Sequence, residues 1–242
     1  MSDDHPKWLF DESSPVGVDY TEADTAAGYD HQHERFRDFE QEARKIAAAL
    51  GLSGDSAVLD MGCGTGGLTI HLAQICRRVY AVDTSSAMIS VLRGKTEKQG
   101  LKNVTAMHSG FLTYEHEGEE LDGIIANITL HHLPDFWKQI ALCRFYDLLK
   151  AGGRLFLNDV VFSFDPRQYR EVIDDWIARM QDIAGRQMAQ ETVVHVRDEF
   201  STWEWVLTGM VERAGFRIDT HFAFMPHMRA YICSKQQGEN DV

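Results

Sequence analysis

The chain has 242 residues, of which 44% are apolar and 25% are charged, a composition typical of a globular protein with one sizeable core. It carries 24 Lys and Arg against 37 Asp and Glu. The resulting net charge of −13 argues against nucleic acid as a partner, because such binding depends on neutralising phosphates. The sequence contains no run of about 18 apolar residues, so we expect no membrane span.

The cysteines and the first residues bear on metals and on the cellular compartment. Cys63, Cys76, Cys143 and Cys233 are scattered and form no CxxC pair, so we expect neither a disulfide framework nor a metal site. The opening stretch, MSDDHPK, is acidic and polar, unlike the basic and then apolar start of a secretion signal. We therefore expect a cytoplasmic protein with no membrane partner.

The first fifty residues predict an irregular arm followed by a helix. Residues 1–20 lack hydrophobic periodicity. From Thr21 to about Leu50 the apolar residues recur at spacings of three and four, which is typical of one face of a helix. Gly51 and Gly54 end this helix.

Strands and helices then alternate as far as residue 161. Each predicted strand is a short apolar run, and the helices lie between polar caps and glycines. The strands are Ala57–Met61, Arg78–Asp83, Val104–His108, Leu121–Ala126 and Arg154–Val161, and the helices are Leu68–Cys76, Ser85–Gln99 and Pro134–Leu149. This alternation predicts a parallel sheet covered by helices on both faces.

The alternation stops after Phe162. The stretch from Pro166 to about Gln190 predicts one or two helices, and Phe200 to Ala214 predicts another. Two strands follow, Phe216–Phe224 and Met228–Ser234, and their short connection predicts an antiparallel pair.

The stretch 60-DMGCGTGG-67 places four glycines where a strand meets a helix. In open α/β sheets ligands bind at the carboxyl ends of strands, and glycine lets the backbone approach them closely. The spacing Gly62-x-Gly64-x-x-Gly67 satisfies a dinucleotide pattern, whereas Asp60-x-Gly62-x-Gly64-x-Gly66 satisfies a different one. The Asp60 carboxylate would repel a pyrophosphate but suits the ammonium group of a methionine.

The second pattern resembles the first motif of the class I S-adenosylmethionine-dependent methyltransferases. Further segments resemble that family from about Tyr29 to Ser234, in the family's order. They are 28-GYD-30, Asp83 at the end of the second strand, 121-LDGIIANITLHHLPD-135, 151-AGGRLFLND-159 and 212-ERAGFRI-218. The resemblance implies an α/β, Rossmann-like, seven-stranded, mostly parallel sheet of order 3-2-1-4-5-7-6, with the last strand antiparallel and added lid helices.

The resemblance also implies the division of a single domain and its cofactor site. Residues 1–50 form the arm and lid helix, 51–162 the cofactor-binding core, 163–214 the substrate-lid helices and 215–235 the final strand pair. The implied cofactor is S-adenosylmethionine, which methyl transfer converts to S-adenosylhomocysteine. The residues implied to bind it are Tyr29, Asp60, Gly62, Cys63, Gly64, Gly66, Asp83, Thr84, Met88, Gly110, Phe111 and Asn127.

Two of these positions need comment. Asp83 stands where the family has an acid that accepts both ribose hydroxyls, since a carboxylate offers two oxygens. After the third strand the family commonly has Gly-Asp, with the acid near the adenine amino group, but this chain has Ser109-Gly110. The Gly110 backbone, the Phe111 N–H or the Ser109 hydroxyl can substitute for that acid.

The acceptor is less determined by the sequence. The chain lacks the Asn/Asp-Pro-Pro-Tyr arrangement of amide and adenine methylation and the Pro-Cys nucleophile of cytosine methylation. An oxygen, sulfur, amine or activated carbon of a small molecule remains. His131 and His132 follow the fourth strand and are candidate catalytic bases, or they only fix the loop. Asp159 is either functional or a loop cap.

The lid helices and the alternative functions complete the predictions. The apolar lid residues, which form an acceptor pocket or pack the helices together, are Tyr169, Trp176, Met180, Met188, Trp203 and Trp205. His31 and His33 are two residues apart on the predicted helix and are expected in solvent rather than on a metal. The alternatives are a tRNA or protein methyltransferase, a nicotinamide-dependent dehydrogenase, and a cofactor-binding regulator or inactive partner.

Overall fold

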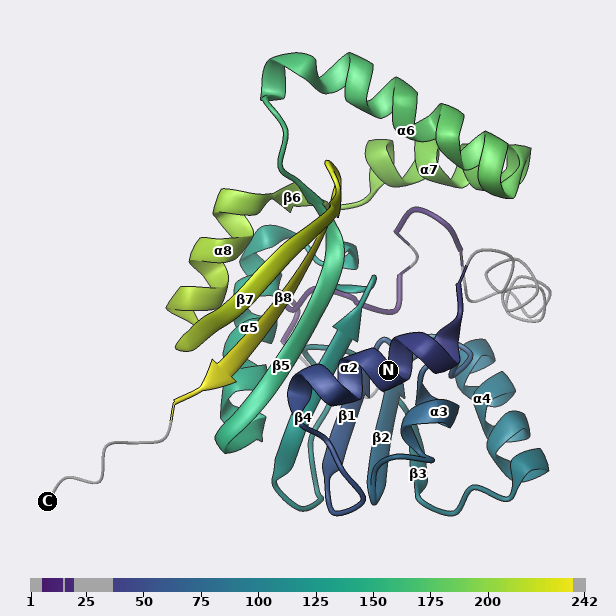
Figure 1. Cartoon of the computed structure of the whole chain (residues 1–242), viewed down its shortest axis with the longest axis vertical. Helices are drawn as coiled ribbons and strands as arrows, with labels where there is room; N and C mark the ends of the chain where they lie inside the picture. The colour runs from purple at the N-terminus through teal and green to yellow at the C-terminus, as the bar shows by residue number, and fades with distance from the viewer. Residues whose placement is uncertain (1–5, 15, 20–36, 237–242) are drawn as a thin grey trace, which may run out of the picture.

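The computed structural model describes residues 6–14, 16–19 and 37–236, and these build one mixed sheet with helices around it (Figure 1). The strands are β1 Ala57–Met61, β2 Arg78–Asp83, β3 Val104–His108, β4 Leu121–Asn127, β5 Leu149–Phe162, β6 Thr202–Trp203, β7 Phe216–Met225 and β8 Met228–Lys235. Their order is β3-β2-β1-β4-β5-β8-β7, with β6 pairing β5 outside this path.

This topology confirms the predicted strand order. The first five strands run parallel, and β8 is antiparallel to both β5 and β7. The prediction of seven strands was one short, because Thr202 and Trp203 pair with Val161 and Phe162 as the two-residue strand β6. A strand so short has no periodicity to be recognised by.

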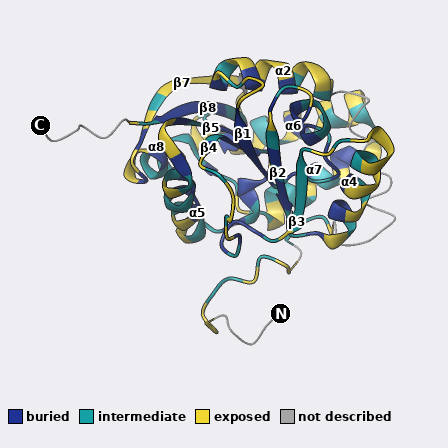
Figure 2. Ribbon diagram, turned by 90° about the horizontal axis from the view of Figure 1, so that it is seen from below, coloured by how far each residue is buried: buried dark blue, intermediate teal, exposed yellow. Residues whose placement is uncertain are grey.

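Helices cover both faces of the sheet. The helices are α2 Phe39–Leu50, α3 Thr69–Leu72, α4 Ser86–Gln99, α5 Asp135–Leu148, α6 Tyr169–Ala184, α7 Arg186–Asp198 and α8 Glu204–Arg213, with 3₁₀ turns at η1 Leu130–His132 and η2 Pro166–Gln168. Alternate residues of β1 face opposite layers, as the pleat requires. Val58 packs with α2 and α3, and Leu59 packs with α5 and α8. The central strands such as β1 and β4 are accordingly buried, whereas the edge strands β3 and β7 are partly or largely exposed (Figure 2).

Three predicted helices have shorter bounds. The helix expected from Thr21 to Leu50 begins at Phe39 in the described residues, because Asp38 caps it by accepting the N–H of Gln41 at 2.9 Å, and residues 20–36 lie outside the described part. The helix expected over Leu68–Cys76 is regular only at Thr69–Leu72, because the Asn103 amide donates to the carbonyls of Ala73 and Cys76 at 2.8 and 3.0 Å and ends it. The helix expected from Phe200 begins at Glu204, since β6 occupies the residues before it.

The segment between β5 and β6 forms two helices that stand beyond the carboxyl end of β5 (Figure 1). Gly185, at φ 92°, separates α6 from α7. The predicted lid segment therefore lies at the edge of the sheet where parallel α/β folds bind ligands. No helix among the described residues is long and apolar enough to cross a membrane.

Candidate active site

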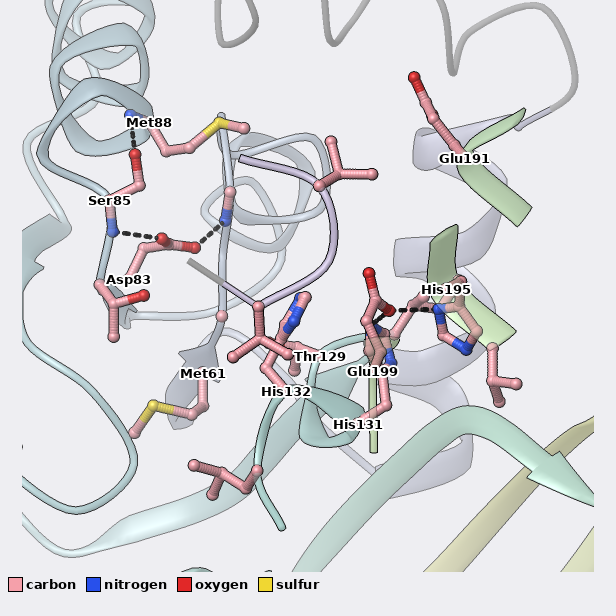
Figure 3. A pocket seen from close by; sticks show the side chains of 18 of the residues that line it. Met61, Asp83, Ser85, Met88, Thr129, His131, His132, Glu191, His195 and Glu199 are labelled. Atoms are coloured by element: carbon pink, nitrogen blue, oxygen red, sulfur yellow. Dashed lines mark hydrogen bonds and ion pairs between the residues drawn. The ribbon is translucent and has the colours of Figure 1, made fainter. Parts of the chain in front are cut away.

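A cavity of about 530 Å³ lies at the carboxyl ends of β1, β2 and β4, a size typical of small-molecule sites. One end is lined by Asp83, Met88 and Gly110, and the other by His131 and Trp176. Figure 3 shows the two ends, with Asp83 and Ser85 on one side and the histidines on the other. One continuous space thus connects the predicted cofactor residues with the predicted acceptor residues.

The glycine turn after β1 forms the wall between these ends. The N–H groups of Gly62 and Cys63 both donate to the carbonyl of Val82, at 2.8 and 3.0 Å, and tie the turn to β2. Gly62 has φ 72°, and a Cβ there would lie 2.0 Å from Thr129 Oγ1, so only glycine fits. Gly64, at φ 53°, has no atom within 4 Å of such a Cβ, and its backbone is open to the cavity.

Asp83 ends β2 at the cavity wall. Its carboxylate accepts the N–H of Gly64 and the N–H of Ser85, each at 2.8 Å. Burial raises the pKa of Asp83 above its ordinary value, although these two hydrogen bonds oppose the shift. The carboxylate is therefore held in a fixed orientation between the glycine turn and the start of α4.

Asp60 lies behind the turn. Its carboxylate is buried and accepts the Thr69 hydroxyl at 2.6 Å. Burial, reinforced by the negative charge of Asp83, raises the pKa of Asp60 to about 6. Such an acid gains from a positive charge brought near it.

The predicted cofactor residues divide into three groups. Gly62, Gly64, Asp83, Thr84, Met88, Gly110 and Phe111 line the cavity. Asp60, Cys63, Gly66 and Asn127 lie outside its lining. Of these, Asn127 accepts the Asn158 amide at 2.8 Å, and burial raises the pKa of the Cys63 thiol well above its ordinary value. Tyr29 lies outside the described residues, as do His31 and His33.

Glu12 was missed by the sequence analysis. It lines the cavity from the N-terminal arm, and its carboxylate would meet a Cβ at Gly110 at 2.6 Å. Glu12 Oε1 accepts the N–H of Leu112 at 2.9 Å, whereas the buried Oε2 has no hydrogen-bond partner among the described residues. Burial raises the pKa of Glu12. The arm thus places a carboxylate beside Ser109-Gly110, where the family's usual acid is missing.

His131 begins the other end of the cavity. It lies on η1 directly after β4, and its Nδ1 donates to Asp159 Oδ1 at 2.5 Å. Asp159 also accepts the N–H groups of His131 and Val160, at 3.0 and 2.7 Å. Asp159 therefore both caps the loop and orients the imidazole, which leaves His131 Nε2 as the ring nitrogen that faces away from β5.

Glu199, just after α7, lies next to that nitrogen. Its Oε2 is 3.2 Å from His131 Nε2 and forms an ion pair with His195 Nδ1. His195 Nε2 in turn bonds the Ser201 hydroxyl at 2.7 Å. The ring of His132 lies beside that of His131 at an interplanar angle of 52°, with ring centroids 4.3 Å apart. Residues from β4, β5 and the lid thus meet in one cluster (Figure 3).

The charged groups of this cluster shift one another's pKa. Burial would lower the pKa of His131, but the charge and the hydrogen bond of Asp159 outweigh it and leave the pKa raised. Burial would likewise raise the pKa of Asp159 and of Glu199, but the neighbouring histidines lower both. Burial and the charge of His131 lower the pKa of His132 to about 3, so that His132 is neutral at physiological pH.

Comparison with known proteins places this geometry in a family. A sequence model described as "Methyltransferase domain" matches residues 58–153. An uncharacterised methyltransferase of Geobacillus kaustophilus is 30% identical over 152 residues, which cover 63% of this chain and 67% of the relative. The chain belongs to the class I S-adenosylmethionine-dependent methyltransferases.

Solved structures of methyltransferases share the fold. An S-adenosylmethionine-dependent methyltransferase from Clostridium acetobutylicum matches with a TM-score of 0.64 at 15% identity, over 89% of this chain and 98% of that one. The magnesium protoporphyrin IX methyltransferase of Synechocystis, solved with bound S-adenosylmethionine, matches with a TM-score of 0.56 at 19% identity, over 93% and 88%. These likenesses show a shared fold, and membership of the family carries the S-adenosylmethionine cofactor that the sequence predicts.

The lid of this methyltransferase contributes part of the predicted apolar set. Trp176, Met180 and Met188 line the cavity. Tyr169 is 52% exposed and Trp205 75% exposed, and neither lines it. Trp203 packs on Phe162 and Phe164, with ring centroids 5.6 and 5.3 Å away. Periodicity alone did not distinguish the residues that face the cavity from those that face solvent or pack beside β5.

Proposed function

We propose that this methyltransferase transfers a methyl group to a small-molecule acceptor bound between the histidine cluster and the lid helices. The observation that carries the proposal is the single cavity that joins Asp83 to His131 and continues beneath α6 and α7. A cofactor bound at the Asp83 end would direct its reactive group toward the histidine end.

The residues at the Asp83 end fit this cofactor. Gly64 leaves space for a ligand against the backbone, and the carboxylates of Asp83 and Glu12 stand at different points along the wall. We propose that Asp83 accepts the ribose hydroxyls and that the unpaired Glu12 Oε2 accepts the adenine amino group. Asp60, behind the turn, attracts the ammonium group through its charge.

The cofactor supplies a sulfonium methyl group that is open to displacement in line with its carbon–sulfur bond. The protein's contribution is to orient the acceptor and to exclude water. Trp176, Met180 and Met188 give the acceptor end apolar walls, and His131 and Glu199 give it a polar floor. This combination suits an acceptor with an apolar body and one polar reacting group.

The charge of the cavity lining favours a small-molecule acceptor over tRNA, whose binding needs a basic rim. Among the described lining residues Arg37 is the one Lys or Arg, whereas Glu12, Asp83, Glu191 and Glu199 supply four acids. Phosphate contacts need the opposite balance. The fold neighbour from Synechocystis, whose named substrate is a magnesium porphyrin, supports the small-molecule class. The cavity beside His131 also counts against an inactive partner protein with a closed acceptor site.

A screen of acceptors tests this proposal. The purified protein is incubated with S-adenosylmethionine and with panels of small hydroxyl, thiol and amine compounds, and release of S-adenosylhomocysteine is measured. We expect turnover with at least one compound, and Trp176→Ala should raise its KM with little change in cofactor affinity. Turnover only with tRNA or a protein substrate would contradict the small-molecule proposal.

A further inference from the structure

The cluster at the acceptor end has the donor set of a metal site. One ring nitrogen each from His131 and His132 and one oxygen of Glu199 lie within 4.8 Å of one another. The two histidines come from η1 after β4, and the carboxylate comes from the residue after α7. The three donors border the cavity, so an ion among them would face the acceptor.

The surrounding hydrogen bonds orient these donors as ligands. Histidines that bind metals commonly donate their other ring N–H to a carboxylate, which fixes the tautomer. Asp159 takes the Nδ1 proton of His131 at 2.5 Å and leaves Nε2 directed at Glu199. His195 holds Glu199 from the other side, and Ser201 holds His195 at 2.7 Å. Both donors are therefore supported by a second layer of partners.

The spacing of the central pair fits one bridging ion. Bonds of about 2.0–2.1 Å in a tetrahedral site set neighbouring donor atoms about 3.3–3.4 Å apart. His131 Nε2 and Glu199 Oε2 are 3.2 Å apart. A ring nitrogen of His132 lies within 4.8 Å of both of these atoms.

Glu199 is the group that most needs a positive partner. Its side chain is only 3% exposed, and Oε2 makes no hydrogen bond of standard geometry with the described residues, although two ring nitrogens lie near it. Asp159 adds a second buried carboxylate. Lys138, whose charge also reaches the cluster, is paired with Asp135 at 2.8 Å. A divalent cation would add positive charge beside both buried carboxylates, which are otherwise paired, among the described residues, only with the imidazoles of His131 and His195.

We propose that His131, His132 and Glu199 bind a divalent transition-metal ion of the zinc class, with an open coordination position toward the acceptor. Two imidazoles and one carboxylate suit Zn²⁺ and its first-row neighbours, whereas Mg²⁺ and Ca²⁺ prefer oxygen donors alone. In this arrangement the two histidines are ligands rather than general bases.

The chemical role of this ion rests on the proposed function, because the ion would activate the acceptor for methyl transfer. An acceptor with a hydroxyl or thiol group would bind the open position, where the ion lowers the pKa of that group. The O–H or S–H bond breaks, the proton leaves to water, and the electron pair stays on the acceptor atom. The acceptor class is therefore a hydroxyl or thiol compound with an apolar body, whose oxygen or sulfur binds the ion.

Metal binding is measured separately from methyl transfer. The full-length protein is dialysed against a chelator and titrated with Co²⁺, followed by its visible d–d absorption, and with Zn²⁺ by calorimetry. We expect one ion per chain with a distorted four- or five-coordinate spectrum. Glu199→Gln and His132→Ala should each weaken Zn²⁺ binding by at least about 100-fold, and Asp159→Asn, which only orients His131, by about 10–100-fold.

His221→Ala is the matched control, because the side chain of His221 is 48% exposed and lies outside the cluster, on β7. This variant should bind Zn²⁺ as the wild type does. Binding of S-adenosylhomocysteine to each variant verifies its fold at the other end of the cavity. Failure of the metal-free wild type to bind S-adenosylhomocysteine would count against the proposed function alone. No Co²⁺ spectrum in the wild type, or equal Zn²⁺ affinity in Glu199→Gln, would overturn the metal site.

Discussion

Replacing Asp60 by Asn should stabilise the cofactor-free protein, and the gain should grow with pH. Asp60 is fully buried, and its pKa is raised from 3.8 to about 6. This difference corresponds to about 3 kcal/mol, at 1.36 kcal/mol for each tenfold change in proton affinity. The asparagine oxygen can still accept the Thr69 hydroxyl, which Asp60 now accepts at 2.6 Å. The substitution therefore removes mainly the charge.

The direction of the pH dependence follows from where the proton is held. Below about pH 4 the acid is protonated in both the folded and the unfolded chain and costs nothing. Between about pH 4 and 6 only the folded chain retains the proton, so the free energy of unfolding of the wild type falls as pH rises. Above about pH 6 the full cost of about 3 kcal/mol remains.

Urea unfolding of the wild type and Asp60→Asn at several pH values measures this difference. The advantage of the variant should increase by up to about 3 kcal/mol from about pH 4 to about pH 7. The comparison cancels the contributions of buried acids that do not interact with Asp60, whereas Asp83, whose charge helps to raise the pKa of Asp60, is coupled to the substitution. Asp147→Asn, on an exposed position of α5, controls for the loss of a carboxylate as such. A difference that stays constant with pH would refute the reasoning.

Three further predictions concern the cofactor end. Asp83→Ala should weaken S-adenosylhomocysteine binding by about 1–3 kcal/mol in calorimetry, since buried donors lose their acceptor, and unchanged affinity would remove Asp83 from the ribose role. Glu12→Ala should weaken S-adenosylhomocysteine binding by about 1.5–3 kcal/mol, yet leave unchanged the affinity for its inosine analogue, which lacks the adenine amino group. Equal losses of affinity for both ligands would exclude the contact with the amino group. Gly62→Ala should lower the free energy of unfolding by about 2–5 kcal/mol, because Gly62 has a positive φ and a Cβ there would meet Thr129. The control Gly94→Ala, at an open helix position, should raise the free energy of unfolding by about 0.5–1 kcal/mol. A loss of stability well under about 2 kcal/mol in Gly62→Ala would show that the turn can shift.

The sheet was predictable because its information is local. Short apolar runs such as Ala57–Met61 recur between helical patterns, and that alternation specifies a parallel sheet without reference to distant residues. The glycine turn is local in its spacing, since the four glycines lie within 60-DMGCGTGG-67, whereas the contact of Gly62 with Thr129 forms only in the folded chain. The strand order and the cofactor residues, by contrast, were implied by the resemblance to the methyltransferase family, and the topology confirms that order.

The acceptor end was not predictable in the same way. Three separate segments supply His131, Asp159 and Glu199, and no sequence pattern around one of them predicts that the other two lie beside it. Glu12, which we propose takes the place of the missing acid after β3, lies 100 residues before Leu112, its hydrogen-bond partner. Only the folded chain brings these side chains together, whereas the expectation of no metal site was drawn from the scattered cysteines and from the spacing of His31 and His33.

A crystal structure with S-adenosylhomocysteine is the most direct test of the shared cavity. The ribose should lie within hydrogen-bond distance of Asp83, the adenine beside Phe111 and Glu12, and the sulfur should face the space beside His131. Methyl transfer at the histidine end requires this orientation. Electron density that places the sulfur away from His131, or the nucleoside outside the Asp83 wall, would contradict it.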